Sequence, residues 1–159
     1  MNIQIRKILE LNNKNFEIML NWLYKWWGFE EHYSKEGLKC WLKCCFQSDK
    51  LPMTYGLFED DRIIGMYQFV NEDLFYRPDI YPWLANVYIE EESRKKGYFN
   101  LMMNSIKNNF PKDSKYKEIY LYTIYEGLYE KHGWEYVGEI DIFQKKNRIQ
   151  RLYKLNLTI

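Results

Sequence analysis

Residues 83–103 read WLANVYIEEESRKKGYFNLMM, and this stretch decides the fold. WLANVYI is an apolar run of the kind found in strands that are buried on both faces of a sheet. A polar turn with three cations follows, and Gly97 then stands where the helical spacing of apolar residues begins. The start of a helix presents unpaired N–H groups and a partial positive charge, and glycine lets the backbone approach a bulky anion. The stretch predicts a strand, an anion-binding turn and a helix; the alternative is a solvated turn with a flexible glycine.

Strand and helix patterns alternate along the rest of the chain. Strand-like patterns occur at residues 3–9, 53–59, 62–70, 118–124, 135–143 and 151–157. Helical spacing occurs at residues 12–27, 34–46, 97–110 and 126–132, and a glycine follows the first and the last of these segments. This order of elements predicts an α/β fold with a central mixed sheet flanked by helices, formed by one domain over residues 1–159.

The composition excludes several classes of function. The chain has 159 residues, of which 47% are hydrophobic and 19% aromatic, so it can bury a packed core. Its net charge of +1 gives no long-range attraction to nucleic acid or to an anionic membrane. No apolar run reaches the roughly 18 residues that a membrane-spanning helix needs. We therefore expect neither nucleic acid nor a membrane as a partner, and phosphate recognition has to be local.

The three cysteines, Cys40, Cys44 and Cys45, lie in one short segment, and charges interrupt the apolar residues at the N-terminus. An odd, clustered set without a secretory signal is typical of reduced thiols in the cytoplasm, which is the location we expect. A metal site with His32 is an alternative. Free cysteine is usually a small buried hydrophobe, however, so we expect no bound metal.

Two motifs resemble a known family. Residues 83–103 resemble the acetyl-coenzyme A motif of the GNAT superfamily of N-acetyltransferases, in which a central strand passes into Arg/Gln-x-x-Gly-x-Gly/Ala and a helix. Arg94 and Gly97 match this motif in spacing. GLYEKHGWEYVGE, residues 127–139, is similar to the second coenzyme-side segment of the superfamily. The chain departs from the motif at Phe99, where the family prefers a small residue. That ring could turn inward as core, or it could crowd the pyrophosphate of the coenzyme.

The resemblance implies a central, mostly antiparallel sheet in which two parallel strands splay apart, and it implies acetyl-coenzyme A as cosubstrate. It assigns backbone groups of Val87, Tyr88 and Ile89 to the pantetheine and the acetyl carbonyl. It assigns the basic turn and the helix start to the pyrophosphate, which gives the binding residues Arg94, Lys95, Lys96, Gly97, Tyr98, Phe99 and Asn100.

Tyr129 takes the place of the family's tyrosine, which protonates the leaving thiolate. A phenol of pKa about 10 can hydrogen-bond a nascent thiolate of pKa about 8.5, so the role is chemically sound. The alternative is a core ring with its hydroxyl at the rim. His132 could act as a general base, although a histidine at a helix C-terminus is also favoured by the helix dipole. The family often has an asparagine where this chain has Tyr122, and no role is transferred to it.

Four acids are candidates to bind or deprotonate an amine: Glu30 and Glu31 after the first helix, and Glu72 and Asp73 after the third strand. The alternative for each is an ordinary surface carboxylate. The resemblance thus implies a GNAT-type acyltransferase that moves an acetyl group to a primary amine by direct attack. The favoured acceptor is a small cation, a polyamine or an aminoglycoside, because a carboxylate-bearing acceptor would be repelled.

Two other readings remain open at this point. A non-catalytic acyl-coenzyme A sensor on the same fold is suggested by Phe99. A protein-interaction domain with an aromatic groove is suggested by the tryptophans at 22, 26, 27 and 41, which we expect instead to pack the two early helices. Both a monomer and a homodimer are compatible with these patterns.

Overall fold

One seven-stranded sheet, ordered β1-β2-β3-β4-β5-β7-β6, organises the computed structural model, which describes residues 1–143 and 145–158. Gln144 and Ile159 of the expected domain lie outside the described residues. The strands are β1 (Ile3–Lys7), β2 (Met53–Glu59), β3 (Arg62–Val70), β4 (Trp83–Ile89), β5 (Glu118–Thr123), β6 (Glu135–Asp141) and β7 (Ile149–Asn156). All neighbours pair antiparallel except β4 and β5, which are parallel. This confirms the predicted mixed, mostly antiparallel sheet.

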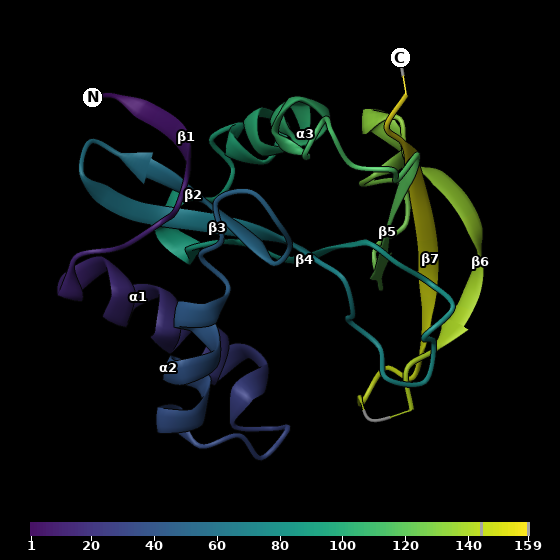
Figure 1. Ribbon diagram of the computed structural model, residues 1–159, viewed down its shortest axis with the longest axis horizontal. Coiled ribbons are helices and arrows are strands. Elements are labelled where there is room, and N and C mark those ends of the chain that lie inside the picture. The colour runs from purple at the N-terminus through teal and green to yellow at the C-terminus, as the bar shows by residue number, and fades with distance from the viewer. Residues whose placement is uncertain (144, 159) are drawn as a thin grey trace.

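Helices cover both faces of the first four strands (Figure 1). The helical elements are α1 (Asn13–Leu23), the π-helical turn η1 (Tyr24–Gly28), α2 (Lys35–Cys44), η2 (Glu91–Ser93), α3 (Tyr98–Asn109) and η3 (Glu130–His132). α1 and α2 pack on one face, against side chains such as Ile63 and Met66. α3 packs on the other face, against side chains such as Tyr67 and Phe69. None of the helices in the described part of the chain has the length and apolarity that crossing a bilayer requires.

Two of the predicted helices differ in detail from the structure. The first ends as an α-helix at Leu23 and continues as a π-helical turn, closed by a hydrogen bond from the Phe29 N–H to the Tyr24 carbonyl. Such turns are uncommon and often occur at functional sites. The segment predicted as a helix at residues 126–132 forms only the 3₁₀ turn η3. It ends at Gly133 with φ +86°, a conformation that favours glycine.

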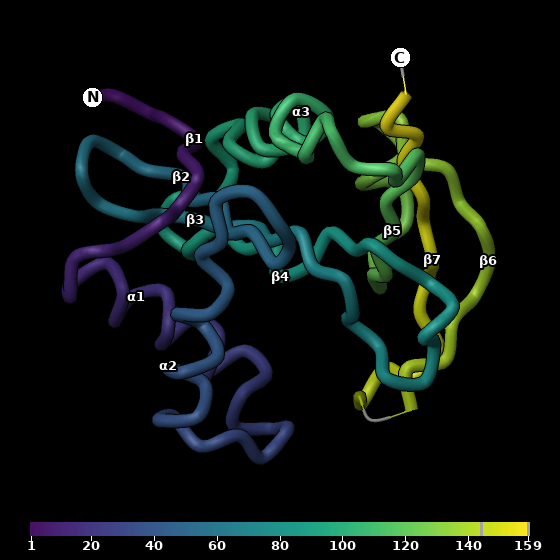
Figure 2. The backbone as a smooth tube through the Cα atoms, in the orientation of Figure 1, coloured from purple at the N-terminus to yellow at the C-terminus, as the bar shows by residue number. Residues whose placement is uncertain are grey.

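The sheet opens between β4 and β5. These strands pair only at Trp83 and Tyr120, near the start of β4. On its other edge β4 pairs with β3, and the register shifts between Met66 and Gln68. Asn86 has φ +52° in this bulge, which bends the strand. Figure 2 shows two groups of strands on either side of the opening: β1, β2, β3 and β4 form one, and β5, β7 and β6 form the other.

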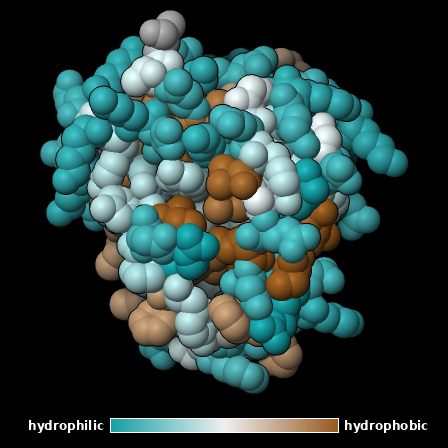
Figure 3. Space-filling view, turned by 90° about the vertical axis from the view of Figure 1, so that its right-hand side faces the viewer, coloured by the Kyte–Doolittle hydropathy of each residue, from teal (hydrophilic) through white to brown (hydrophobic). Residues whose placement is uncertain are grey.

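The outer face of the C-terminal strands is mostly hydrophilic, with hydrophobic side chains showing between polar ones (Figure 3). Val137 and Ile149 are among the exposed apolar residues on β6 and β7. Exposed apolar residues of this kind are normal on a soluble surface. The sheet itself opens elsewhere, between β4 and β5.

Candidate active site

The gap between β4 and β5 opens into a cavity of about 1080 Å³. Its volume slightly exceeds the range of about 300–1,000 Å³ that is typical of small-molecule sites. The wall is built by η1, α2, β4, the turn after β4, the start of α3, β5 and the loop between β6 and β7. Most of the residues singled out from the sequence line it: Val87, Tyr88, Ile89, Arg94, Lys95, Gly97, Tyr98, Phe99, Asn100, Tyr129, Glu30, Glu31 and Asp73. Lys96 and Glu72 are exposed and do not line it.

The basic turn has the geometry of an anion site. Gly97 caps α3 in the left-handed conformation, with φ +82°, and Lys95 is also left-handed, with φ +62°. A Cβ atom placed on Gly97 would meet nothing within 4 Å, so the space at the helix N-terminus is open. The first N–H groups of α3 have no partner within the helix and carry its positive dipole end. The turn can therefore accommodate a phosphate group.

Side-chain contacts fix this turn to the end of β4 and to the start of β3. The Arg94 Nε donates to the Ile89 carbonyl oxygen at 2.8 Å, and its guanidinium lies 5.4 Å from the Tyr88 ring centroid. Glu90 forms a bidentate pair with Arg62, with N–O distances of 2.6 and 2.8 Å. Arg94 is thus partly engaged in holding the turn, and its charge remains close to the helix start.

Phe99 takes the inward of its two expected positions. It is half-buried and packs against the core. Its ring makes edge contacts with Tyr129 and His132, at centroid distances of 5.5 and 5.6 Å. Because the ring lies against these residues, Gly97 keeps its open space. His132, the alternative base, contacts Phe99 and does not line the cavity.

Tyr129 is a buried side chain held in an aromatic cluster. Its ring lies at 6.0 Å from Trp134 and 6.2 Å from Tyr153, and only 7% of the residue is exposed. Within the described residues its hydroxyl makes no hydrogen bond, and the residue lines the cavity. Burial, and to a smaller extent Tyr125, raises the pKa of the Tyr129 phenol. The side chain therefore stays protonated at neutral pH, and its hydroxyl can donate a hydrogen bond into the cavity.

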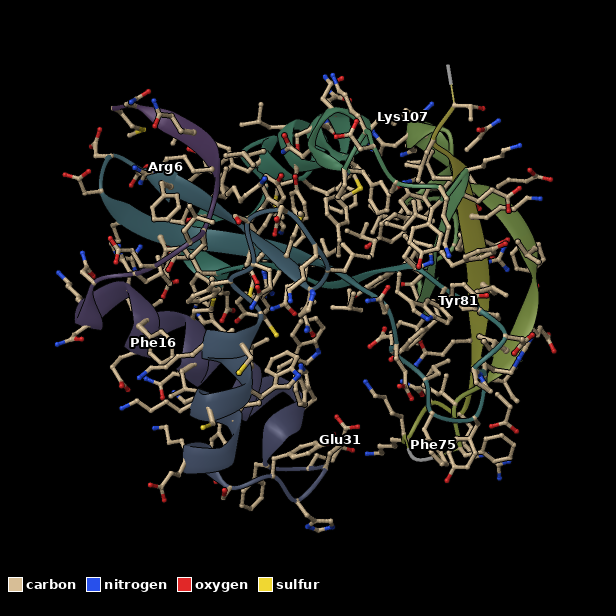
Figure 4. All side chains as sticks on the ribbon, viewed as in Figure 1. Arg6, Phe16, Glu31, Phe75, Tyr81 and Lys107 are labelled. Carbon is tan, nitrogen blue, oxygen red and sulfur yellow. The ribbon has the colours of Figure 1, made fainter. Side chains whose placement is uncertain are left out.

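Carboxylates from separate segments face one another across the opening. Glu31 follows η1 and points toward the segments on the side of Phe75 (Figure 4). Asp73 comes from the loop between β3 and β4, and Lys145 from the loop between β6 and β7. Burial raises the pKa of Asp73 to about 6; Lys145 opposes this shift and Glu31 adds to it. Burial also raises the pKa of Glu31, again opposed by Lys145.

Three tryptophans, which were expected to pack the early helices, form a wall of this cavity. Trp26, Trp27 and Trp41 all line it, and Trp26 and Trp41 are 45% and 38% exposed. Trp27 makes edge contacts with Trp41 at 5.7 Å and with Tyr33 at 5.8 Å. An aromatic wall beside carboxylates is suited to a cation, because ring faces attract positive charge. Across residues 1–143 and 145–158, no group of three His, Cys, Asp or Glu side chains could hold a metal ion.

Sequence reasoning missed Lys145 and Asn86; it singled out the tryptophans but expected them to pack the early helices. Lys145 lies in a basic surface loop that gives no local signal. Asn86 did carry a signal, since it is a polar residue inside the apolar run of β4.

Comparisons with known proteins agree with the fold. The family "Acetyltransferase (GNAT) domain" matches residues 4–153. An N-acetyltransferase from Staphylococcus aureus Mu50 is 12% identical with a TM-score of 0.72, over 99% of this chain and 100% of that one. An aminoglycoside 6'-N-acetyltransferase complexed with coenzyme A is 13% identical with a TM-score of 0.73, over 98% of both chains. Campylobacter jejuni N-acetyltransferase PseH in complex with acetyl coenzyme A is 20% identical with a TM-score of 0.60, over 99% and 100%. No curated protein matches the sequence.

The solved structures share the fold with this chain, and the family match covers nearly its whole length. The open helix start at Gly97 and the unpaired edge of β4 both suit a coenzyme that carries phosphates and a peptide-like arm. The chain therefore belongs to the GNAT acetyltransferase family, whose members are acyltransferases that use acetyl-coenzyme A as cosubstrate.

Proposed function

We propose that this chain transfers the acetyl group of acetyl-coenzyme A to a primary amine of a small cation, a polyamine or an aminoglycoside. The proposal rests on one observation. Glu31 and Asp73 line the same cavity as the tryptophan wall and the edge of β4 that has no β5 partner. Carboxylates and ring faces both favour ammonium groups over anions. One solved structure with this fold is an aminoglycoside 6'-N-acetyltransferase, which supports the same class of acceptor.

The proposed coenzyme site follows the edge of the cavity. Backbone groups of Val87, Tyr88 and Ile89 bind the pantetheine arm and the acetyl carbonyl, since β4 has no β5 partner there. The pyrophosphate lies at the turn, held by Arg94, Lys95, Lys96, Gly97, Tyr98, Phe99 and Asn100. The inward ring of Phe99 leaves the helix start open, so the ground for a non-catalytic sensor is weaker than the sequence suggested.

The proposed reaction is a direct attack. The neutral amine attacks the thioester carbonyl carbon, a C–N bond forms as the C–S bond breaks, and the thiolate leaves. Before the attack, Asp73 accepts the proton that the ammonium loses. Tyr129 donates its proton to the thiolate, and the second proton, which the attacking nitrogen loses as the amide forms, restores the Tyr129 phenol. An effective general base has a pKa near the working pH, and the Asp73 carboxyl, with pKa about 6, is closer to this than an ordinary aspartate.

Lys145 sets a limit on which amines bind well. Its ammonium is close enough to Glu31 and Asp73 to oppose the rise in pKa that burial causes in both carboxyls. A monoamine gains little binding energy when its one ammonium replaces the Lys145 ammonium beside these carboxylates. An acceptor with several ammonium groups, in contrast, can contact both carboxylates at once. The proposal therefore favours polycations over monoamines.

The free thiols Cys40, Cys44 and Cys45 support a cytoplasmic location for this reaction.

The acceptor class is tested by steady-state kinetics with a diamine and a monoamine of equal chain length. Asp73→Asn and Glu31→Gln are expected to raise KM for the diamine about tenfold and for the monoamine about threefold, and high salt should reduce the difference. Glu72→Gln is the matched control, because Glu72 is exposed beside Asp73 and does not line the cavity. Unchanged kinetics in both variants, or an anionic best acceptor, would contradict the proposed acceptor.

A further inference from the structure

A chain of side-chain hydrogen bonds runs from the acceptor wall across β4, β3 and β2 to the end of α2. The Trp27 Nε1–H donates to Asn86 Oδ1 at 3.0 Å, and Asn86 Nδ2 donates to Gln68 Oε1 at 2.7 Å. Gln68 Nε2 then donates to Thr54 Oγ1 at 3.0 Å, and this hydroxyl donates to the Cys45 carbonyl oxygen at 2.9 Å. The chain links η1, β4, β3 and β2.

The direction of every bond in this chain is fixed by its two ends. An indole N–H can only donate, and a backbone carbonyl can only accept. Both amides between them therefore have one orientation in which every bond is made. Gln68 and Thr54 are 0% exposed, so water cannot replace a lost partner. Removal of one member leaves a buried polar group unpaired, which costs more than the net gain of one bond.

Asn86 is the point at which this chain of bonds reaches the β4 gap. Its φ of +52° lies in the left-handed region, which asparagine tolerates better than most residues. Both ends of its side-chain amide are bonded, which holds that backbone conformation. The next residues, Val87 to Ile89, line the cavity and have no β5 partner. The orientation of their backbone groups thus depends on the conformation at Asn86.

We propose that Thr54 and Gln68 are positioning residues that act through Asn86 to hold the bulge of β4 in the shape that binds acetyl-coenzyme A. Neither side chain lines the cavity, so neither touches the coenzyme or the acceptor. Through Trp27 the same bonds connect the acceptor wall to the coenzyme strand. The inference rests on the proposed function only in that residues 87–89 contact the coenzyme.

Thr54→Val and Thr54→Ser form the test pair. Valine keeps the shape and loses the hydroxyl, whereas serine keeps the hydroxyl and loses a methyl group. One broken bond in a buried chain should weaken acetyl-coenzyme A binding about tenfold in Thr54→Val, and Thr54→Ser should remain within about twofold. Calorimetry with acetyl-coenzyme A gives both dissociation constants. Gln68→Met, which removes two bonds at similar volume, should repeat the Thr54→Val result and serves if that variant does not fold.

A second readout follows the far end of the chain. The indole N–H resonance of Trp27, identified as the one lost in Trp27→Phe, should exchange with solvent faster in Thr54→Val than in Thr54→Ser. In the unaltered protein, acetyl-coenzyme A should shift this resonance, and that measurement needs no Thr54 or Gln68 variant. A role in stability alone would lower the melting temperature of both Thr54 variants and leave the dissociation constants equal.

Equal affinities in the two Thr54 variants, or no shift of the Trp27 resonance with acetyl-coenzyme A, would overturn the proposal. A protein that binds acetyl-coenzyme A and acetylates no amine would refute the proposed function, and the binding comparison would still decide this inference. Absence of acetyl-coenzyme A binding in the unaltered protein would overturn both.

Discussion

The open space at Gly97 gives a sharp test of the pyrophosphate site. Gly97→Asp places a carboxylate at the N-terminus of α3, where a Cβ atom meets nothing within 4 Å. Gly97→Asn is the matched control, because asparagine and aspartate are nearly the same size and both tolerate a positive φ. The two variants therefore share the cost of the left-handed backbone at φ +82° and differ in one charge.

The magnitude follows from Coulomb's law. Two unit charges about 5 Å apart interact by about 0.8 kcal/mol at the dielectric constant of water. A pyrophosphate presents two such charges, which gives about 1.6 kcal/mol, and an effective dielectric constant slightly below that of water raises this penalty to about 2 kcal/mol. That penalty weakens binding about thirtyfold. Ligand at 100 times its dissociation constant stabilises a fold by about 2.7 kcal/mol, which the thirtyfold loss reduces to about 0.9 kcal/mol.

The assay is acetyl-coenzyme A binding by calorimetry, with the rise in melting temperature as a second readout. Gly97→Asn should remain protected by the coenzyme, and Gly97→Asp should lose most of the protection. In 1 M salt, where the screening length is about 3 Å, the two variants should converge. Equal affinity of Gly97→Asp and Gly97→Asn in low salt would refute a pyrophosphate at this turn.

Three further changes test other parts of the site. Tyr129→Phe keeps the ring and removes the proton, so kcat should fall about 100-fold while coenzyme affinity is retained; unchanged kcat with chemistry rate-limiting would make Tyr129 a core residue. Asp73 accepts a proton only when ionised, so kcat/KM should fall as pH falls through about 6, and Asp73→Asn should lack this limb of the pH profile. Gly65→Ala places a Cβ 2.8 Å from the Tyr88 carbonyl oxygen. It should lower the free energy of unfolding, measured in urea, by about 1–3 kcal/mol and weaken coenzyme binding. If neither quantity changes, the close contact between β3 and β4 does not shape the site.

Local patterns were sufficient to predict most of the fold. The apolar run of β4, the polar turn and Gly97 lie next to one another in the chain, so each constrains its neighbours directly. The start of α2 at Ser34 was also predicted correctly. The Ser34 hydroxyl accepts a hydrogen bond from the Gly37 N–H at 2.9 Å. The segment at 126–132 was wrong in extent, because its i to i+3 hydrogen bonds end after one turn at Gly133.

The acceptor side was less predictable because it is assembled from distant segments. Glu72 and Asp73 are adjacent, and an irregular loop has no periodicity that tells which one faces inward; only Asp73 lines the cavity. The partners of Asn86 lie 59 residues away at Trp27 and 18 residues away at Gln68. Pairings of this kind depend on strand register and helix packing, which a single sequence does not contain.

We propose that an acetyl group passes in this cavity from acetyl-coenzyme A to a cationic amine. Release of the coenzyme thiol is the decisive measurement of this transfer. The unaltered protein is mixed with acetyl-coenzyme A and, in turn, with a polyamine, an aminoglycoside, an amino acid and an acidic peptide. We expect thiol release that depends on the amine and is fastest with the polyamine or the aminoglycoside. Coenzyme binding with no amine-dependent release from any of these acceptors would contradict it.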